Sequence, residues 1–148
     1  MTLFPPYRRL RRVIWDANVT NPITYVTQIS YLLFLKMLEE MDAERKQTAN
    51  GTYKTLFGVF DAGDEKVDFD LLRWSRLTSD PDNDRMLRTL RDTLPKFALH
   101  PLLSQGAKAV FQNASVVIPN GAALRNAVDI IAPISFMAVD ADVKGDLF

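Results

Sequence analysis

The sequence predicts an all-α fold, an irregular helical bundle around one long central apolar helix. Three observations predict it: apolar residues recur at helical spacing in several segments, no segment alternates as a strand does, and one stretch is apolar on nearly every side. The chain has 148 residues, of which 47% are hydrophobic and 24% charged. That length and composition are typical of one globular domain, so we expect a single helical domain over residues 1–148.

Two helices are expected in the first third of the chain. A helix over 6–18 follows Pro5 and Pro6, which suit the entry to a first turn. Asn21 and Pro22 then begin a longer helix over 23–46, because an Asn side chain caps free N–H groups and proline has no N–H to lose. The apolar face of the first helix consists of Tyr7, Leu10, Ile14 and Ala17. The second helix carries one apolar line of Val26, Ile29, Leu33 and Met37, with Leu32, Leu35 and Leu38 beside it.

The remaining elements are shorter. Residues 52–67 predict a loop with at most a short strand or turn, because aromatic residues alternate with glycines before an acidic stretch. Asp68 can cap a short helix over 69–77. A further helix after Asp80 and Pro81 is indicated by Leu87, Leu90, Leu94 and Phe97 on one face. Helices over 102–111 and 121–131 complete the prediction, and residues 116–118 are too few to found a sheet.

Several motifs resemble catalytic or metal sites but lack a required residue. Phe4-Pro5-Pro6-Tyr7 is similar to the signature of amino-directed DNA methyltransferases, whose first residue must be Asn, Asp or Ser to accept a hydrogen bond from the target amino group. The acids of 80–84 have EF-hand spacing, but Arg85 and Arg91 replace the required glycine and glutamate. Asp140 and Asp142 match that pattern less well, because Lys144 occupies the position where a third acid is required.

No other residue in the sequence indicates a catalytic, cofactor-binding or metal-binding site. The chain has no cysteine, His100 has no orienting acid or hydroxyl in the neighbouring sequence, and no glycine-rich phosphate-binding motif occurs. We therefore expect no catalytic, cofactor-binding or metal-binding residue in these 148 residues.

Arginines provide the candidate binding residues. Arg8, Arg11 and Arg12 share one face of the helix over 6–18 with Trp15, and such a face can contact DNA phosphates. Eighteen Lys and Arg balance eighteen Asp and Glu, so the same face is equally explained as a solvated surface that pairs with acids. Weaker candidates for contacts with the DNA backbone are Arg85, Arg88 and Arg91.

The order of short motifs along the chain resembles the N-terminal part of the modification (M) subunits of type I restriction-modification systems. The resemblance departs from the family in the loop 18–21, which is shorter and lacks Leu-Arg-Gly. The matching segments are Ile14-Trp15-Asp16-Ala17, Tyr25, Leu32-Leu33-Phe34-Leu35-Lys36, Arg73-Trp74-Ser75, His100-Pro101-Leu102-Leu103 and residues 142–148.

The resemblance implies a role in DNA methylation. The complete subunit would transfer a methyl group from S-adenosylmethionine to adenine N6, and residues 140–148 would begin the junction to its catalytic domain. The domain itself would support assembly and enclose double-stranded DNA, together with a specificity subunit, a second M subunit and a restriction subunit. Because no apolar stretch approaches the length of a membrane span or forms a secretory signal, we expect a cytoplasmic protein. The alternatives are a helical protein–protein interaction module unrelated to methylation and, less favoured, a small DNA-binding repressor.

Overall fold

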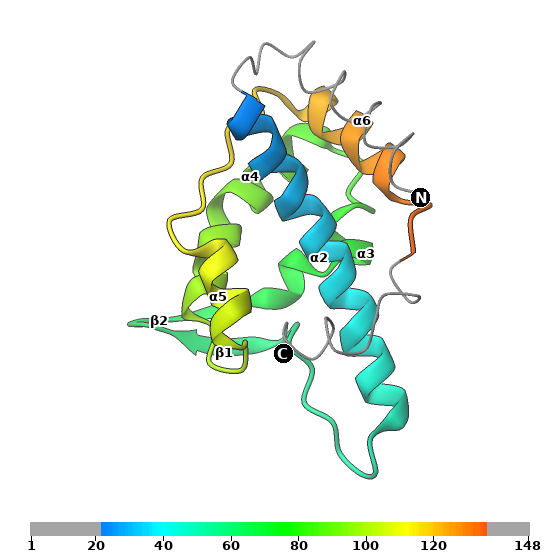
Figure 1. Ribbon diagram of the computed structural model, residues 1–148, viewed down its shortest axis with the longest axis vertical. Helices are drawn as coiled ribbons and strands as arrows, with labels where there is room; N and C mark the ends of the chain where they lie inside the picture. The colour runs from blue at the N-terminus through cyan, green and yellow to red at the C-terminus, as the bar shows by residue number, and fades with distance from the viewer. Residues whose placement is uncertain (1–21, 136–148) are drawn as a thin grey trace.

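The computed structural model describes residues 22–135 and is mostly helical, with one small antiparallel hairpin (Figure 1). The prediction of a mainly helical fold is confirmed. The predicted helix over 6–18 and the junction over 140–148 lie outside the described residues. In chain order the elements are α2 (Pro22–Thr48), β1 (Val59–Ala62), β2 (Glu65–Asp68), η1 (Phe69–Leu72), α3 (Trp74–Leu77), α4 (Asn83–Thr93), η2 (Leu94–Leu99), α5 (Gln105–Phe111) and α6 (Gly121–Ile131), where η marks a 3-10 helix.

The long helix α2 runs diagonally across the other helices in Figure 1 and packs against α3 and α6. Its fully buried positions are Ile29, Leu32, Leu35 and Leu38. The other predicted line is buried only in part: Ile29 is fully buried, but Val26 is 42% exposed and Leu33 packs against the edge of the core. The structure thus confirms a long helix, and one face of this helix is buried. The described residues do not enclose it on every side, as the sequence predicts for a central apolar helix. No helix in the described range is long and apolar enough to cross a membrane.

Residues 52–67 are predicted as a loop with at most a short strand or turn; the structure has no regular element over 52–58 and then two paired strands, β1 and β2. The two strands pair antiparallel with Phe60 opposite Val67, and both side chains point into the core. Gly63 makes the tight turn between the strands with a φ of +67°, a left-handed conformation that favours glycine. Each strand has only four residues, so the alternation of buried and exposed side chains is too short to recognise in the sequence alone.

Two predicted helices are interrupted in the structure. The helix expected to continue through Phe97 ends at Thr93, and residues 94–99 form η2. Pro95 lies at the start of η2 and has no N–H to continue α-helical hydrogen bonding. The predicted helix over 69–77 divides into η1 and α3, because Arg73 between them is extended with a ψ of 124°. The predicted helix over 121–131 agrees with α6.

Aromatic side chains fill the core between the hairpin, η2 and α5. Phe57, Phe69, Phe97 and Phe111 are fully buried, and the rings of Phe69 and Phe97 are stacked with their centroids 5.1 Å apart. At the opposite end α6 starts directly against α4. A side chain on Gly121 would bring its Cβ to 2.5 Å from the carbonyl carbon of Asn83, so only glycine permits this approach.

The burial pattern of α2 predicts unequal costs for two neighbouring leucines. We expect Leu35→Ala to lower the free energy of unfolding by about 2 to 5 kcal/mol, because it removes a fully buried side chain and leaves a cavity. Leu33→Ala should cost on the order of 1 kcal/mol, because a half-buried side chain loses less packing. Urea unfolding followed by circular dichroism measures both, and equal costs would contradict the observed orientation of α2.

Candidate functional site

Two of the three weaker arginine candidates contact neighbouring groups of the protein. Arg85 makes a two-point ion pair with Asp80, with Nε to Oδ2 at 2.8 Å and Nη2 to Oδ1 at 2.6 Å. The hydrogen bond from Arg85, assisted by the N–H of Asp82, lowers the pKa of Asp80 to about 2. Arg91 donates to the carbonyl oxygen of Ile118 at 3.4 Å. Two of the three side chains are therefore directed towards neighbouring protein groups.

Arg88 is the exception. Its side chain is exposed and makes no hydrogen bond or ion pair within residues 22–135. Asp84 and Asp92 lie four residues before and after it on α4, which reduces the local positive potential. A DNA contact by these arginines stays a prediction, with Arg88 as its one unengaged member. The stronger candidates Arg8, Arg11 and Arg12 lie outside the described residues.

The acidic loop at 80–84 has a capping role. Asp82 begins α4 by accepting the N–H of Arg85 at 3.0 Å, and Asp80 accepts the N–H of Asp82 at 2.9 Å. Arg125 of α6 closes this loop from the other side by donating to Asn83 Oδ1 at 2.8 Å and to the carbonyl oxygens of Thr78 and Asp80. These carboxylates therefore have structural partners that explain their spacing.

The Arg73-Trp74-Ser75 segment joins α3 to the long helix. Glu39 of α2 accepts hydrogen bonds from the N–H of Ser75 at 3.0 Å and from its hydroxyl at 2.5 Å. Trp74 is buried in the core. Arg73 donates to Asp70 at 2.6 Å and lies over the ring of Phe57. The segment is thus a structural joint.

The ion pairs around that joint hold Asp70 in its charged form. Burial alone would raise the pKa of Asp70, but hydrogen bonds from Arg73 and Arg76 outweigh it and lower the pKa below its ordinary value.

His100 is completely buried and has both ring nitrogens engaged. Its Nδ1 accepts the N–H of Leu102 at 3.0 Å, so Nε2 carries the proton and donates to the carbonyl oxygen of Leu56 at 2.8 Å. The rings of Phe60 and Phe69 lie 4.4 and 4.6 Å from the imidazole. Burial lowers the pKa of His100. The histidine therefore holds a turn in place and is not accessible to a substrate.

Three buried polar side chains that the sequence analysis did not single out fix the loops around α2. Asp42 accepts hydrogen bonds from Tyr53, Thr55 and the backbone of Leu56. Gln28 binds an extended segment at two points, donating to Ser115 O at 2.9 Å and accepting from Val117 N at 3.0 Å. Lys36 donates to the carbonyl oxygen of Ile134 and pairs with Glu40. A polar residue on an otherwise apolar helix face is the one signal that could have found them.

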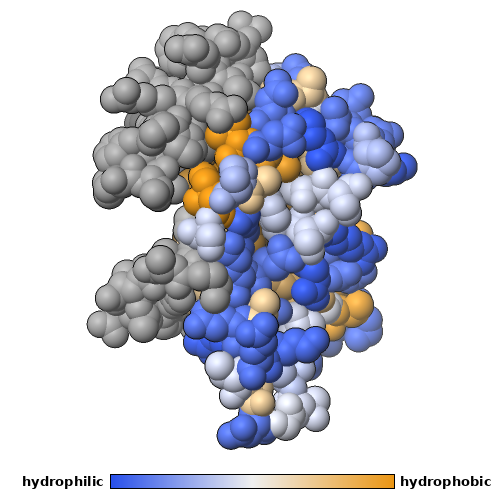
Figure 2. Space-filling view, turned by 90° about the vertical axis from the view of Figure 1, so that its right-hand side faces the viewer, coloured by the Kyte–Doolittle hydropathy of each residue, from blue (hydrophilic) through white to orange (hydrophobic). Residues whose placement is uncertain are grey.

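The surface seen in Figure 2 is largely hydrophilic over the described residues, with a small hydrophobic patch beside the grey atoms. Most of this face therefore suits contact with water. The bonded side chains described above hold the fold of residues 22–135 together.

Residues 22–135 thus form a helical domain whose polar side chains bind loops and helix ends. The family model of the HsdM N-terminal domain matches residues 10–131. The chain belongs to this family, and it is thereby part of a type I restriction-modification methyltransferase subunit. No curated protein matches the chain. No solved structure matches it either.

The buried histidine predicts a specific loss of stability in mild acid. Because the pKa of His100 is lower in the folded chain than its ordinary value of 6.5, the unfolded chain takes up a proton first as the pH falls. Stability should be unaffected above that value and decrease below it, by at most about 1.4 kcal/mol per pH unit, until the folded pKa is reached.

Urea unfolding between pH 7.5 and 5.5 measures this effect, and His100→Gln should flatten the dependence, because His100 is the only histidine. Nuclear magnetic resonance of the imidazole C–H protons provides a second readout in the folded chain. A ring that titrates at or above 6.5 would contradict the burial argument.

Proposed function

We propose that this domain helps a modification subunit enclose double-stranded DNA and hold its assembly together, without making or breaking bonds itself. The observation that carries the proposal is the family match over residues 10–131. It is supported by the committed roles of the polar side chains described above, which bind loops and helix ends. Within the whole subunit, S-adenosylmethionine would supply the methyl group for adenine N6, and the target base must leave the duplex for that reaction.

The partners in this proposal are a specificity subunit, a second modification subunit and a restriction subunit, in the cytoplasm. The specificity subunit would read the sequence, so this domain needs only contacts with phosphates, which position without reading bases. We also propose that α2 is the centre of the bundle in the complete subunit. Val26 and Leu33 support this proposal, because the described residues leave these apolar side chains partly exposed and other parts of the subunit would cover them.

The arginine face provides the test of DNA enclosure. We expect Arg8→Gln, Arg11→Gln and Arg12→Gln together, in the full assembly, to weaken binding of matched and mismatched DNA by similar factors. Each lost phosphate contact should reduce the slope of log affinity against log salt by roughly 0.9, because fewer counterions are released. Fluorescence anisotropy at several salt concentrations measures both quantities.

The matched control replaces Arg85, Arg88 and Arg91 by glutamine. It removes the same formal charge, but Arg85 and Arg91 are directed to protein partners, so the salt slope should change by no more than about one contact. Enclosure of DNA by the arginine face is refuted if the first triple variant keeps the parent's affinity and salt slope.

A further inference from the structure

The turn that follows η2 exposes two large aliphatic side chains on a rigid support. Leu99 is 55% exposed and Leu102 is 42% exposed. Between them, His100 is fully buried and bonded through both ring nitrogens. The backbone N–H of His100 also donates to the carbonyl oxygen of Phe97 at 3.1 Å. The turn is thus fixed with the histidine inside and the leucines outside, an arrangement that contributes nothing to burying apolar surface within the described core.

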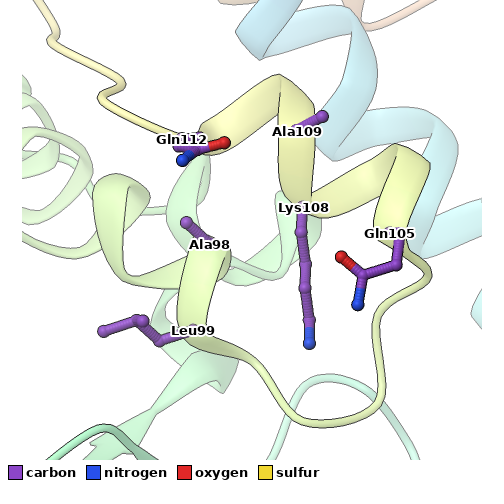
Figure 3. Close-up of a pocket in the computed structure, with 6 residues that line it drawn as sticks. All are labelled: Ala98, Leu99, Gln105, Lys108, Ala109 and Gln112. Atoms are coloured by element: carbon purple, nitrogen blue, oxygen red, sulfur yellow. The ribbon is translucent and has the colours of Figure 1, made fainter.

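A hollow of about 310 Å³ adjoins this turn and opens to solvent. Figure 3 shows Lys108 extending from α5 into the space between Leu99 on one side and Gln105 on the other. The loop that joins η2 to α5 passes below the tip of Lys108 in the same view. The lining residues are Ala98, Leu99, Gln105, Lys108, Ala109 and Gln112. The hollow therefore combines apolar walls, two side-chain amides and one positive charge.

The charge of Lys108 is uncompensated within residues 22–135. Three other lysines have a carboxylate partner there: Lys36 pairs with Glu40, Lys66 with Asp61, and Lys96 with Glu65. Lys108 has none, and no carboxylate lines the hollow. The amide of Gln105 likewise makes no side-chain hydrogen bond in the described part of the chain, so a second donor that suits an acidic group lies beside Lys108 in Figure 3.

We propose that this hollow, which we call the Lys108 hollow, binds an acidic segment of a partner protein that also carries aliphatic side chains. A carboxylate of the segment would face the Lys108 ammonium and the Gln105 amide, and its aliphatic neighbours would cover Leu99 and Leu102. Charge complementarity decides the sign of the partner. The exposed leucines decide the class of the partner. Aliphatic side chains of a peptide bury apolar surface against leucine, whereas a phosphate backbone has little apolar surface to bury there. The proposal uses residues that the proposed DNA role does not, and either can fail without the other.

Selection from a random peptide library displayed on phage tests the chemistry without assuming a sequence. The bait is the 148-residue chain, with counter-selection on Lys108→Glu. We expect enrichment of peptides in which Asp or Glu is flanked by Leu, Ile or Val. Titration of an enriched synthetic peptide into the isotope-labelled chain should shift the amide signals of residues 98–112.

Three variants then separate the contributions. Lys108→Glu should weaken the peptide at least about tenfold and Leu99→Ser about fivefold, because each removes a central contact. Lys46→Glu, an exposed lysine at the end of α2, is the matched control and should change affinity less than about twofold. Leu99 and Lys46 are exposed and Lys108 is half-buried, so folding, checked by circular dichroism, should be retained.

Two results would overturn the proposal. One is no enrichment, or enriched peptides that shift signals elsewhere or bind Lys108→Glu equally well. The other is a short DNA duplex that shifts residues 98–112, loses affinity in Lys108→Glu and keeps it in Leu99→Ser, which would assign the hollow to phosphate contact.

Discussion

The arrangement of the described chain depends on the backbone of Leu56, which two buried side chains hold from opposite sides. Its N–H donates to Asp42 of α2 at 3.0 Å, and its carbonyl oxygen accepts from His100 of the turn after η2 at 2.8 Å. A buried carboxylate is costly unless hydrogen-bonded, and Asp42 is satisfied by three donors. Burial and the Asp42 carboxylate raise the pKa of Tyr53, so its hydroxyl stays a donor throughout the ordinary pH range. One residue thereby connects the long helix, the segment before the hairpin and the turn that carries Leu99.

This connection places the aromatic core and, through it, the surface. Phe57 follows Leu56 directly and is fully buried, with its ring 6.3 Å from that of Phe97. Phe97 in turn lies 5.1 Å from Phe111 of α5, so the helix that bears Lys108 is positioned by the same cluster. The pair His100 and Leu56 then determines which side of the turn faces outward. Rigid exposure of leucines next to an uncompensated lysine follows from the packing beneath them.

The sequence predicts elements that local pattern defines and misses those that depend on tertiary contacts. Residues 121–131 have both a capping Asn120 and continuous apolar spacing, and the helix there agrees with the structure. The hairpin does not follow from local pattern, because the four residues of β1 include only two buried positions and those of β2 only one. The sequence does not select the buried face of α2, because several apolar lines compete on that helix. Gln28 and Asp42 share the face of Leu32 and Leu35, and a weighting of such polar residues as buried anchors would have selected the correct line.

The candidate site was harder to predict because the roles of charged residues depend on neighbours distant in the sequence. Arg85 and Arg88 are equivalent in the sequence pattern, yet one is neutralised by Asp80 and the other has no partner in the described range. The same argument explains why Arg73 serves the fold: an acid three residues earlier and an aromatic ring sixteen residues earlier both contact it. Net charge therefore says little about where this domain can bind a partner. The binding surface is determined by the charged side chains that have no partner within the fold. In residues 22–135 this favours the neighbourhood of Lys108 over Arg85, Arg88 and Arg91 of α4.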